Sequence, residues 1–137
     1  MILYTSEDFV ARVKEATGDK GVSVVYDSVG ATTFLKGLDC LRPLGMMVLF
    51  GQSSGVVAPV SPSVLAAKGS LFLTRPSLFH YVADRQSLEA RAGAVFEAVK
   101  DGTLKVRIDR DYKLEEVAEA HKALEARATS GKVLLGT

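Results

Sequence analysis

Residues 21–30 read GVSVVYDSVG, and this stretch decides the fold. Its first half, Val22 to Tyr26, is a run of apolar and β-branched residues with one serine, and it is too short for a helix. The second half, residues 27–30, consists of small and polar residues ending in glycine. A buried strand that runs into a tight turn is therefore expected here.

Two further apolar runs lie downstream, MMVLF at residues 46–50 and LFLT at residues 71–74. Apolar residues at helical spacing over 34–41 predict a helix between the first two strands, which Pro43 and Gly45 stop. Ser61 and Pro62 are expected to be the N-cap and first residue of a short helix that ends at Gly69. Strands that alternate with helices in this way predict an α/β fold with a parallel sheet flanked by helices.

Helices are also predicted at both ends of the chain. Thr5 and Asp8 have capping-box spacing before a helix that ends at Gly18. Asp84 is expected to cap a long helix that ends at Gly102. The remaining expected elements are a half-exposed strand around 106–108, a helix over 114–124 and a terminal strand over 132–135.

Composition narrows the class of protein. The 137 residues are 47% hydrophobic, which suits one core of ordinary size. Seventeen basic and sixteen acidic residues are mixed along the chain, so nothing favours nucleic acid or a membrane surface as a partner. Cys40 is the only cysteine, so no internal disulfide can form, no structural metal site is indicated, and a reducing cytoplasm is expected.

The candidate ligand loops follow the first two strands, at residues 27–30 and 50–55. Ligands of open α/β sheets bind outside the carboxyl ends of the strands, and small residues there let a ligand approach the backbone. Neither loop matches a phosphate-binding fingerprint, because the chain contains neither G-x-G-x-x-G nor G-x-x-x-x-G-K-[ST]. The alternative interpretation is that both loops are ordinary turns, in which the glycines serve only the backbone conformation.

No side chain here is indicated as a catalytic acid, base or nucleophile. His121 falls on an apolar helical stripe and is expected to be packed, and His80 has no acidic or nucleophilic neighbour at a recognisable spacing. Cys40 is expected to be a small buried side chain. The absence of such groups is typical of an enzyme whose bound cofactor carries the reaction, while the protein positions the reactants and excludes water.

The blocks at residues 21–30, 38–43, 50–55, 68–78 and 118–127 together resemble the zinc-independent, zeta-crystallin-like NADPH:quinone oxidoreductases of the medium-chain dehydrogenase superfamily. The resemblance runs through nearly the whole chain in order. It implies a larger two-domain enzyme that transfers hydride from NADPH to a quinone or activated carbonyl. This chain is then expected to be its C-terminal portion, inactive alone. In such enzymes a Rossmann domain is joined to a GroES-like catalytic domain.

Carried over residue by residue, the resemblance implies cofactor-binding roles and no metal site. Tyr4 corresponds to a tyrosine near the adenosine phosphate, and Ser28 with Gly30 to the turn along the cofactor. Phe50, Gly51 and Ser53 correspond to the loop bordering the nicotinamide carboxamide. Arg127 corresponds to an arginine that reaches the cofactor from the catalytic domain.

The resemblance also sets the expected domain organisation. Residues 1–78 correspond to the C-terminal part of the Rossmann domain, lacking its first strands and the pyrophosphate loop. Residues 79–137 correspond to C-terminal elements that return toward the catalytic domain, within one compact body. Because the usual sheet order is 3-2-1-4-5-6, strand 22–26 becomes an exposed edge and the first helix has no obvious sheet to cover. A homodimer through strand 71–74 is implied as well.

Two other classes of function stay open. The chain could be a dimerisation or structural module without catalysis, because the pyrophosphate loop is absent. It could also be a methyltransferase-like α/β domain that uses Asp27 on an adenosyl ribose, although the glycine-rich first loop of such domains is absent too. Cofactor titration separates the enzyme-derived interpretation from the structural one.

Overall fold

The computed structural model describes residues 1–136. The chain divides into two compact units, Met1–His80 and a second that begins at Tyr81. Each unit is described by itself below. The roles assigned above to residues 1–78 and 79–137 stay predictions.

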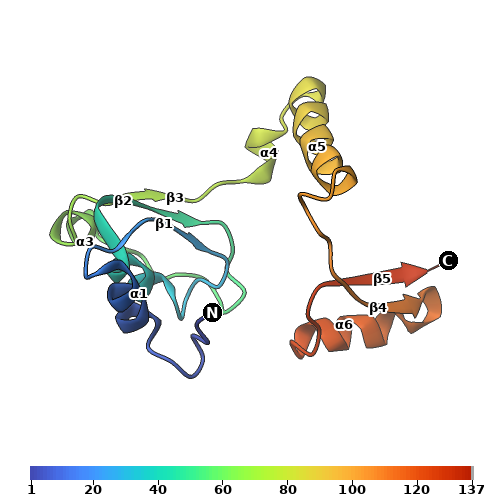
Figure 1. Cartoon of the computed structure of the whole chain (residues 1–137), viewed down its shortest axis with the longest axis horizontal. Coiled ribbons are helices and arrows are strands. Elements are labelled where there is room, and N and C mark those ends of the chain that lie inside the picture. The colour runs from blue at the N-terminus through green and yellow to red at the C-terminus, as the bar shows by residue number, and fades with distance from the viewer. Residues whose placement is uncertain (137) are drawn as a thin grey trace. The chain divides into compact units, whose positions relative to one another are not determined.

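A three-stranded parallel sheet forms the centre of the first unit (Figure 1). Its strands are β1 (Val22–Asp27), β2 (Leu41–Leu49) and β3 (Phe72–Thr74), in the order β1-β2-β3. Val25 pairs with Met47, and Met47 pairs with Leu73. The expected α/β class with a parallel sheet and flanking helices is confirmed.

Three helices accompany this sheet: α1 (Phe9–Thr17), α2 (Phe34–Asp39) and α3 (Pro62–Ala67). Ser61 caps α3, as expected, because its hydroxyl accepts a hydrogen bond from Ser63 N. The expected cap of α1 was wrong at Thr5. Asp8 is the N-cap instead, with its carboxylate accepting from Val10 N at 3.1 Å. Helix α1 contacts α2.

The helix predicted over 34–41 was too long. It ends at Asp39, and Leu41 already pairs with Val22 as the first residue of β2. Residues 42–45 then bulge out of the ladder, since Val24 pairs with Met46 rather than with residue 43. Pro43 and Gly45, expected to stop a helix, lie in this bulge.

The core of the first unit lies on one face of the sheet. Phe34 and Leu38 of α2 are each 1% exposed, and they pack with the fully buried Met47 of β2. Leu41, Leu49 and Leu71 complete the buried cluster. Glycine is required at position 37, because a Cβ there would lie 2.7 Å from the Met47 methyl carbon. Helix α2 therefore sits unusually close to the sheet.

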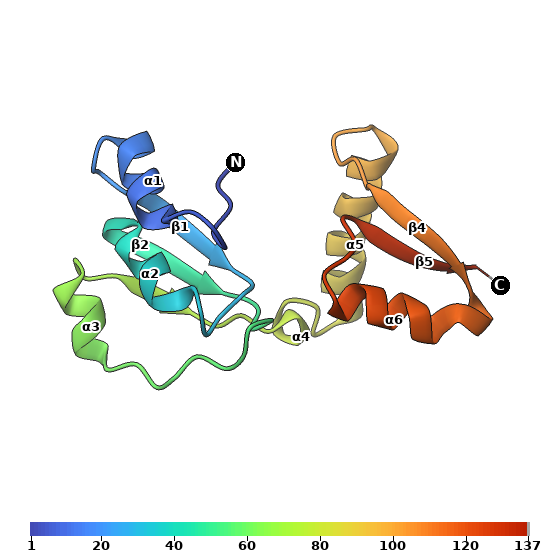
Figure 2. The ribbon, with the colours of Figure 1, turned by 90° about the horizontal axis from the view of Figure 1, so that it is seen from below.

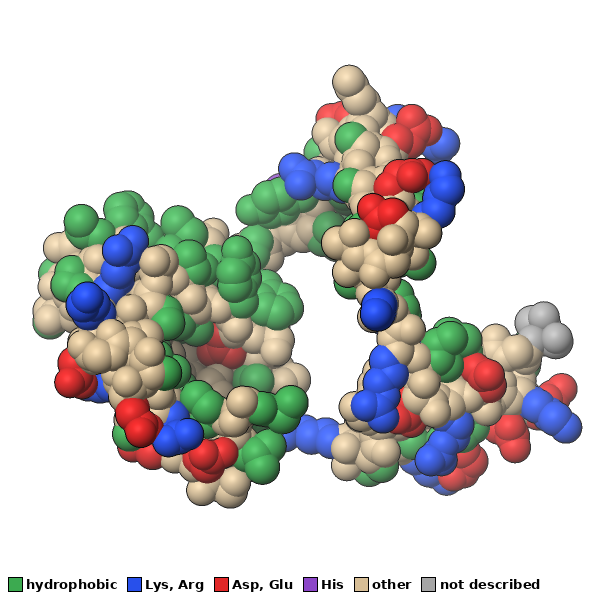
Figure 3. Space-filling model, viewed as in Figure 1, with side chains coloured by type: hydrophobic (Ala, Val, Ile, Leu, Met, Phe, Trp, Pro, Cys, Tyr) green, Lys and Arg blue, Asp and Glu red, His purple; other side chains and the backbone are tan. Residues whose placement is uncertain are grey.

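The opposite face of the sheet is open. Val24, Tyr26, Met46 and Phe72 alternate with the core-facing residues of their strands, and all four are exposed. Figure 3 shows hydrophobic side chains gathered along the side of this unit where β2 and β3 run.

The second unit combines helices with a two-stranded parallel sheet (Figure 2). A short helix, α4 (Leu78–Tyr81), spans the boundary and is followed by α5 (Arg85–Lys100), which Asp84 caps as expected. Strand β4 (Ile108–Lys113), a 3-10 turn (Leu114–Glu116), α6 (Val117–Glu125) and β5 (Lys132–Gly136) complete it. Strands β4 and β5 pair directly, with α6 between them in the chain.

Two leucines of α2 test where the core lies. Leu38→Ala should lower the free energy of unfolding by about 2–5 kcal/mol, because it empties a buried site. Leu35→Ala on the same helix removes a side chain that is 58% exposed, and it should change stability by roughly 0.5 kcal/mol or less. Urea unfolding measures both variants. Equal losses would contradict the burial of Leu38 and the exposure of Leu35 on this helix.

Candidate functional site

Two loops meet at the carboxyl ends of β1 and β2. The turn at residues 28–30 lies against the loop at residues 51–55, joined by backbone hydrogen bonds. Ser53 N donates to Ser28 O at 3.2 Å, and Ser54 N donates to Val29 O at 2.8 Å. The Ser54 hydroxyl also donates to Val29 O, at 2.7 Å. The two loops chosen from sequence are therefore one structural feature.

Glycines make this close approach possible. A Cβ at Gly51 would lie 2.5 Å from the carbonyl oxygen of Ser28, which no side chain can tolerate. A Cβ at Gly30 would lie 2.9 Å from Gln52 Cα, and Gly30 also has a positive φ of 88°. Both predicted glycines are thus required where one loop lies against the other.

Asp27 is the polar side chain that lies deepest at this edge, with 5% of its surface exposed. Its Oδ1 accepts hydrogen bonds from Val29 N at 2.7 Å and from Gly30 N at 3.0 Å. The Thr33 hydroxyl donates to the same carboxylate at 2.9 Å. Because these oxygens already accept hydrogen bonds from the protein, they are poorly placed to bind a ribose hydroxyl. The methyltransferase-like interpretation relied on Asp27 as its ribose ligand and is therefore not supported.

A cavity of about 280 Å³ opens beside the turn. Its walls are mainly apolar and come from the N-terminal segment, α1, β1 and α2. Tyr4 and Ser28 are the two predicted site residues that line it, and both are exposed. Four of the lining residues carry hydroxyl groups: Tyr4, Tyr26, Ser28 and Thr33. A mainly apolar cavity with such groups can hold a flat heterocycle with polar substituents.

The other predicted residues lie outside this cavity. Phe50 is 51% exposed at the end of β2, where its N–H donates to Asp27 O at 2.9 Å. Ser53 is exposed on the adjoining loop. Arg127 belongs to the second unit, where it follows α6 with a positive φ of 55° and is exposed.

The residues judged uninvolved in catalysis differ in their surroundings. Cys40 is 3% exposed, as expected, and burial raises the pKa of its thiol, so the reactive thiolate is disfavoured. His121, expected to be packed, is exposed instead. Its neighbour Ala120 is 3% exposed and is the residue of α6 that faces inward. The buried side of the helix therefore lies one residue before the position that the apolar spacing predicted.

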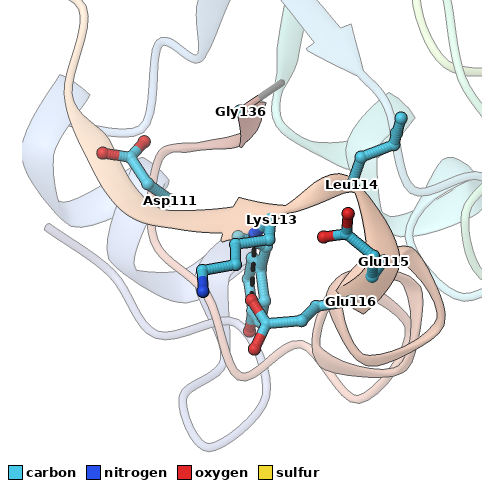
Figure 4. Close-up of a pocket in the computed structure, with 7 residues that line it drawn as sticks. Asp111, Lys113, Leu114, Glu115, Glu116 and Gly136 are labelled. Atoms are coloured by element: carbon cyan, nitrogen blue, oxygen red, sulfur yellow. Dashed lines mark hydrogen bonds between the residues drawn. The ribbon is translucent and has the colours of Figure 1, made fainter.

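A larger hollow of about 770 Å³ lies in the second unit, where β4 ends and the 3-10 turn begins (Figure 4). Asp111 and Glu115 lie at opposite ends of it, and the carboxylate of Glu116 accepts a hydrogen bond from Lys113 N at 2.9 Å. Glu116 therefore serves as a helix cap. None of the sequence-predicted site residues lines this hollow.

Residues 1–136 contain no cluster of three or more histidine, cysteine, aspartate or glutamate side chains that could hold a metal ion. Over the same residues, no helix has both the length and the hydropathy needed to cross a bilayer.

A family described as zinc-binding dehydrogenase matches residues 1–135. The chain belongs to this family. Among relatives, it is 46% identical to quinone oxidoreductase 1 of Escherichia coli over 137 residues and 44% identical to 2-haloacrylate reductase of a Burkholderia species over 135. Each alignment takes in 98% of this chain, but only 42% and 40% of the respective relative. The chain thus spans about two fifths of the length of these curated relatives.

Solved structures agree with the sequence comparison. The structure of Escherichia coli quinone oxidoreductase complexed with NADPH matches with a TM-score of 0.94 and 46% identity, covering 99% of this chain and 42% of that one. A mycobacterial relative complexed with NADPH matches with a TM-score of 0.89 and 43% identity, covering 96% of this chain and 42% of the other. The resemblance noted from the sequence blocks is confirmed.

The contact between the two loops can be tested at Gly51. Gly51→Ala should lower the free energy of unfolding by about 1–3 kcal/mol, because the new methyl group meets the Ser28 backbone. Gly93→Ala is the matched control: Gly93 lies inside α5 with no atom within 4 Å of the added carbon, so alanine should stabilise by about 0.5–1 kcal/mol. Thermal unfolding compares them. A neutral Gly51→Ala would mean that the loops are not in contact.

Proposed function

We propose that this zinc-binding dehydrogenase family chain is the part of an NADPH:quinone oxidoreductase that carries one end of the cofactor site. The observation that carries the proposal is the tied pair of loops at the sheet edge, with Ser28 and Tyr4 lining the adjacent cavity. The relatives named above support it, since two of the matching structures are NADPH complexes. Residues 1–78 are then the C-terminal part of the Rossmann domain, and residues 79–137 belong with the catalytic domain.

The residues present fit a dinucleotide. Gly30 and Gly51 let the two loops close on each other, so that the sheet edge beside the cavity is one compact surface. The cavity beside Ser28 offers apolar walls for the adenosine end, and the Tyr4 hydroxyl can donate to a phosphate. We assign Phe50 and Ser53 to the nicotinamide side of the loop. Arg127 completes the set through the bidentate chemistry of its guanidinium group.

NADPH supplies the hydride, so the protein needs no nucleophile of its own. This chain binds and orients the cofactor, and the apolar walls of the cavity exclude water from it. The proposed acceptor is a quinone or a similarly activated carbonyl compound. The names of the two relatives agree with this class, since quinones and 2-haloacrylates both carry a carbon–carbon double bond conjugated to a carbonyl group.

NADPH binding to the 137-residue chain is the direct test. Isothermal titration should give micromolar affinity, and Tyr4→Phe should weaken it roughly threefold to tenfold through loss of one hydroxyl contact. Tyr112→Phe in the second unit is the control, and it should leave the affinity unchanged. Absence of binding would refute the proposal for this chain taken alone and favour a structural module without catalysis.

The second part of the proposal concerns how two copies of the chain assemble. Strand β3 is a free edge of the sheet, and its outward N–H and C=O groups have no strand beside them among residues 1–136. We propose that two copies pair along β3 to make a continuous sheet in a homodimer.

We also propose that the protein lies in the cytoplasm, where a lone buried thiol such as that of Cys40 stays reduced.

Leu73 tests the dimer. Two β3 strands related by a two-fold axis run antiparallel, so the middle residue of each strand lies close to its own copy. Leu73→Lys should weaken dimerisation by roughly tenfold or more, because like charges then face each other. Val99→Lys, at an apolar position on α5 that is 43% exposed against 40% for Leu73, should leave it unchanged. Sedimentation equilibrium measures both variants, and a monomeric parent protein would rule the interface out.

A further inference from the structure

The strongest unassigned feature is the buried carboxylate of Asp27. It stands among mostly apolar neighbours at the end of β1, yet no cation pairs with it among the ion pairs of the described residues. A buried charge is expensive unless hydrogen bonds satisfy it. Here two backbone N–H groups and one hydroxyl do so. Since Asp27 takes no part in the proposed hydride transfer, its burial points to a structural role at this edge of the sheet.

The main chain of the same residue holds the second loop. Asp27 O accepts from Phe50 N at 2.9 Å and from Gly51 N at 3.2 Å. Asp27 thus fixes the turn at residues 28–30 with its side chain and the start of the loop at 50–55 with its backbone. Ser54 adds a second tie between the loops, since its amide and its hydroxyl both donate to Val29 O.

Thr33 extends the same arrangement into α2. Its hydroxyl donates to both carboxylate oxygens of Asp27 at 2.9 Å, and Thr33 is the N-cap residue of that helix. Since α2 packs on the core through Phe34 and Leu38, the carboxylate is tied to the most rigid part of the unit. The turn that presents Ser28 is therefore anchored to the core through one side chain.

We infer that Asp27 is a positioning residue, which with Thr33 locks the two loops into one rigid edge and so presents Ser28 and Ser53 to the cofactor. The inference rests on the proposed cofactor site and deepens it. Asp27 and Thr33 both line the cavity proposed for the cofactor, so the lock is tested first without cofactor, where a direct contact with it plays no part. A carboxylate is not essential to the role, because the side-chain oxygen of asparagine can accept from the same N–H groups.

Amide exchange measured by NMR tests the lock without any cofactor. The reporters are the amides of Ser53 and Ser54, which bond to the turn but not to the Asp27 side chain. In Asp27→Ala their exchange should accelerate about tenfold or more, and in Asp27→Asn it should stay within about threefold of the parent. Asp84→Ala, which removes an exposed carboxylate that also accepts a backbone N–H, should not change it.

Two results would overturn the inference: unchanged exchange at Ser53 and Ser54 in Asp27→Ala, or equal acceleration in Asp27→Asn. If Asp27→Ala also loses protection at the core amide of Met47, the unit has unfolded and Thr33→Val decides instead. That variant keeps the shape of the side chain and removes only the hydroxyl. It should accelerate both reporters by about threefold or more, and no acceleration would refute the lock.

NADPH titration separates this inference from the proposed function. If the parent chain binds, Asp27→Ala should raise the Kd about tenfold, and Asp27→Asn should restore it. Equal affinity in the parent and in Asp27→Ala would overturn the positioning role while leaving the cofactor site standing. If the parent chain does not bind, the proposed function of the isolated chain fails, and the exchange experiment still decides the role of Asp27.

Discussion

The parallel pairing of β1 with β2 is the constraint on which the first unit depends. It sets Val25 beside Met47, and the buried Met47 receives α2 at a distance that only Gly37 permits. The same pairing brings the ends of the two strands together, Asp27 beside Leu49. The core and the candidate site therefore both depend on one register. A slip of one residue would turn the core-facing side chains of one strand to the opposite face of the sheet.

Local patterns were sufficient to predict most elements of the fold. The apolar runs at 22–26 and 71–74 gave strands, as their β-branched and aromatic residues indicated. The buried strand expected at 22–26 is covered on one face alone, since Val24 and Tyr26 are exposed. The predictions failed where residues far away in the sequence determine the local structure. Leu41 has helical spacing, but its pairing with Val22 draws it into β2. The cap of α1 moved from Thr5 to Asp8, since both residues offer a suitable oxygen and spacing alone does not choose between them.

The candidate site, too, could be predicted from the sequence only in part. Gly30 and Gly51 could be selected from sequence, because a glycine after a strand often marks a close approach. The function of Asp27 could not, since Thr33 lies six residues on and Phe50 follows only after a second strand. An aspartate at the last position of an apolar strand was the available signal. The roles assigned to Tyr4, Phe50, Ser53 and Arg127 still depend on the family resemblance.

Charge contributes little to holding the described residues together. The ion pairs on the helices, such as Arg12 with Glu15 and Arg85 with Glu89, join exposed side chains at helical spacing. Pairs of this kind add roughly 0–1 kcal/mol each. Stability therefore comes mainly from the apolar cluster beneath the sheet, with Phe34 and Met47 among its most buried members.

The open face of the sheet has a thermodynamic consequence. Apolar surface that is already in water, as at Tyr26 and Phe72, contributes nothing to the surface newly exposed on unfolding. Both the heat capacity change of unfolding and the denaturant m-value scale with that newly exposed surface. For a chain of 137 residues both quantities should be small, and its stability curve should be correspondingly flat between the cold and hot limits.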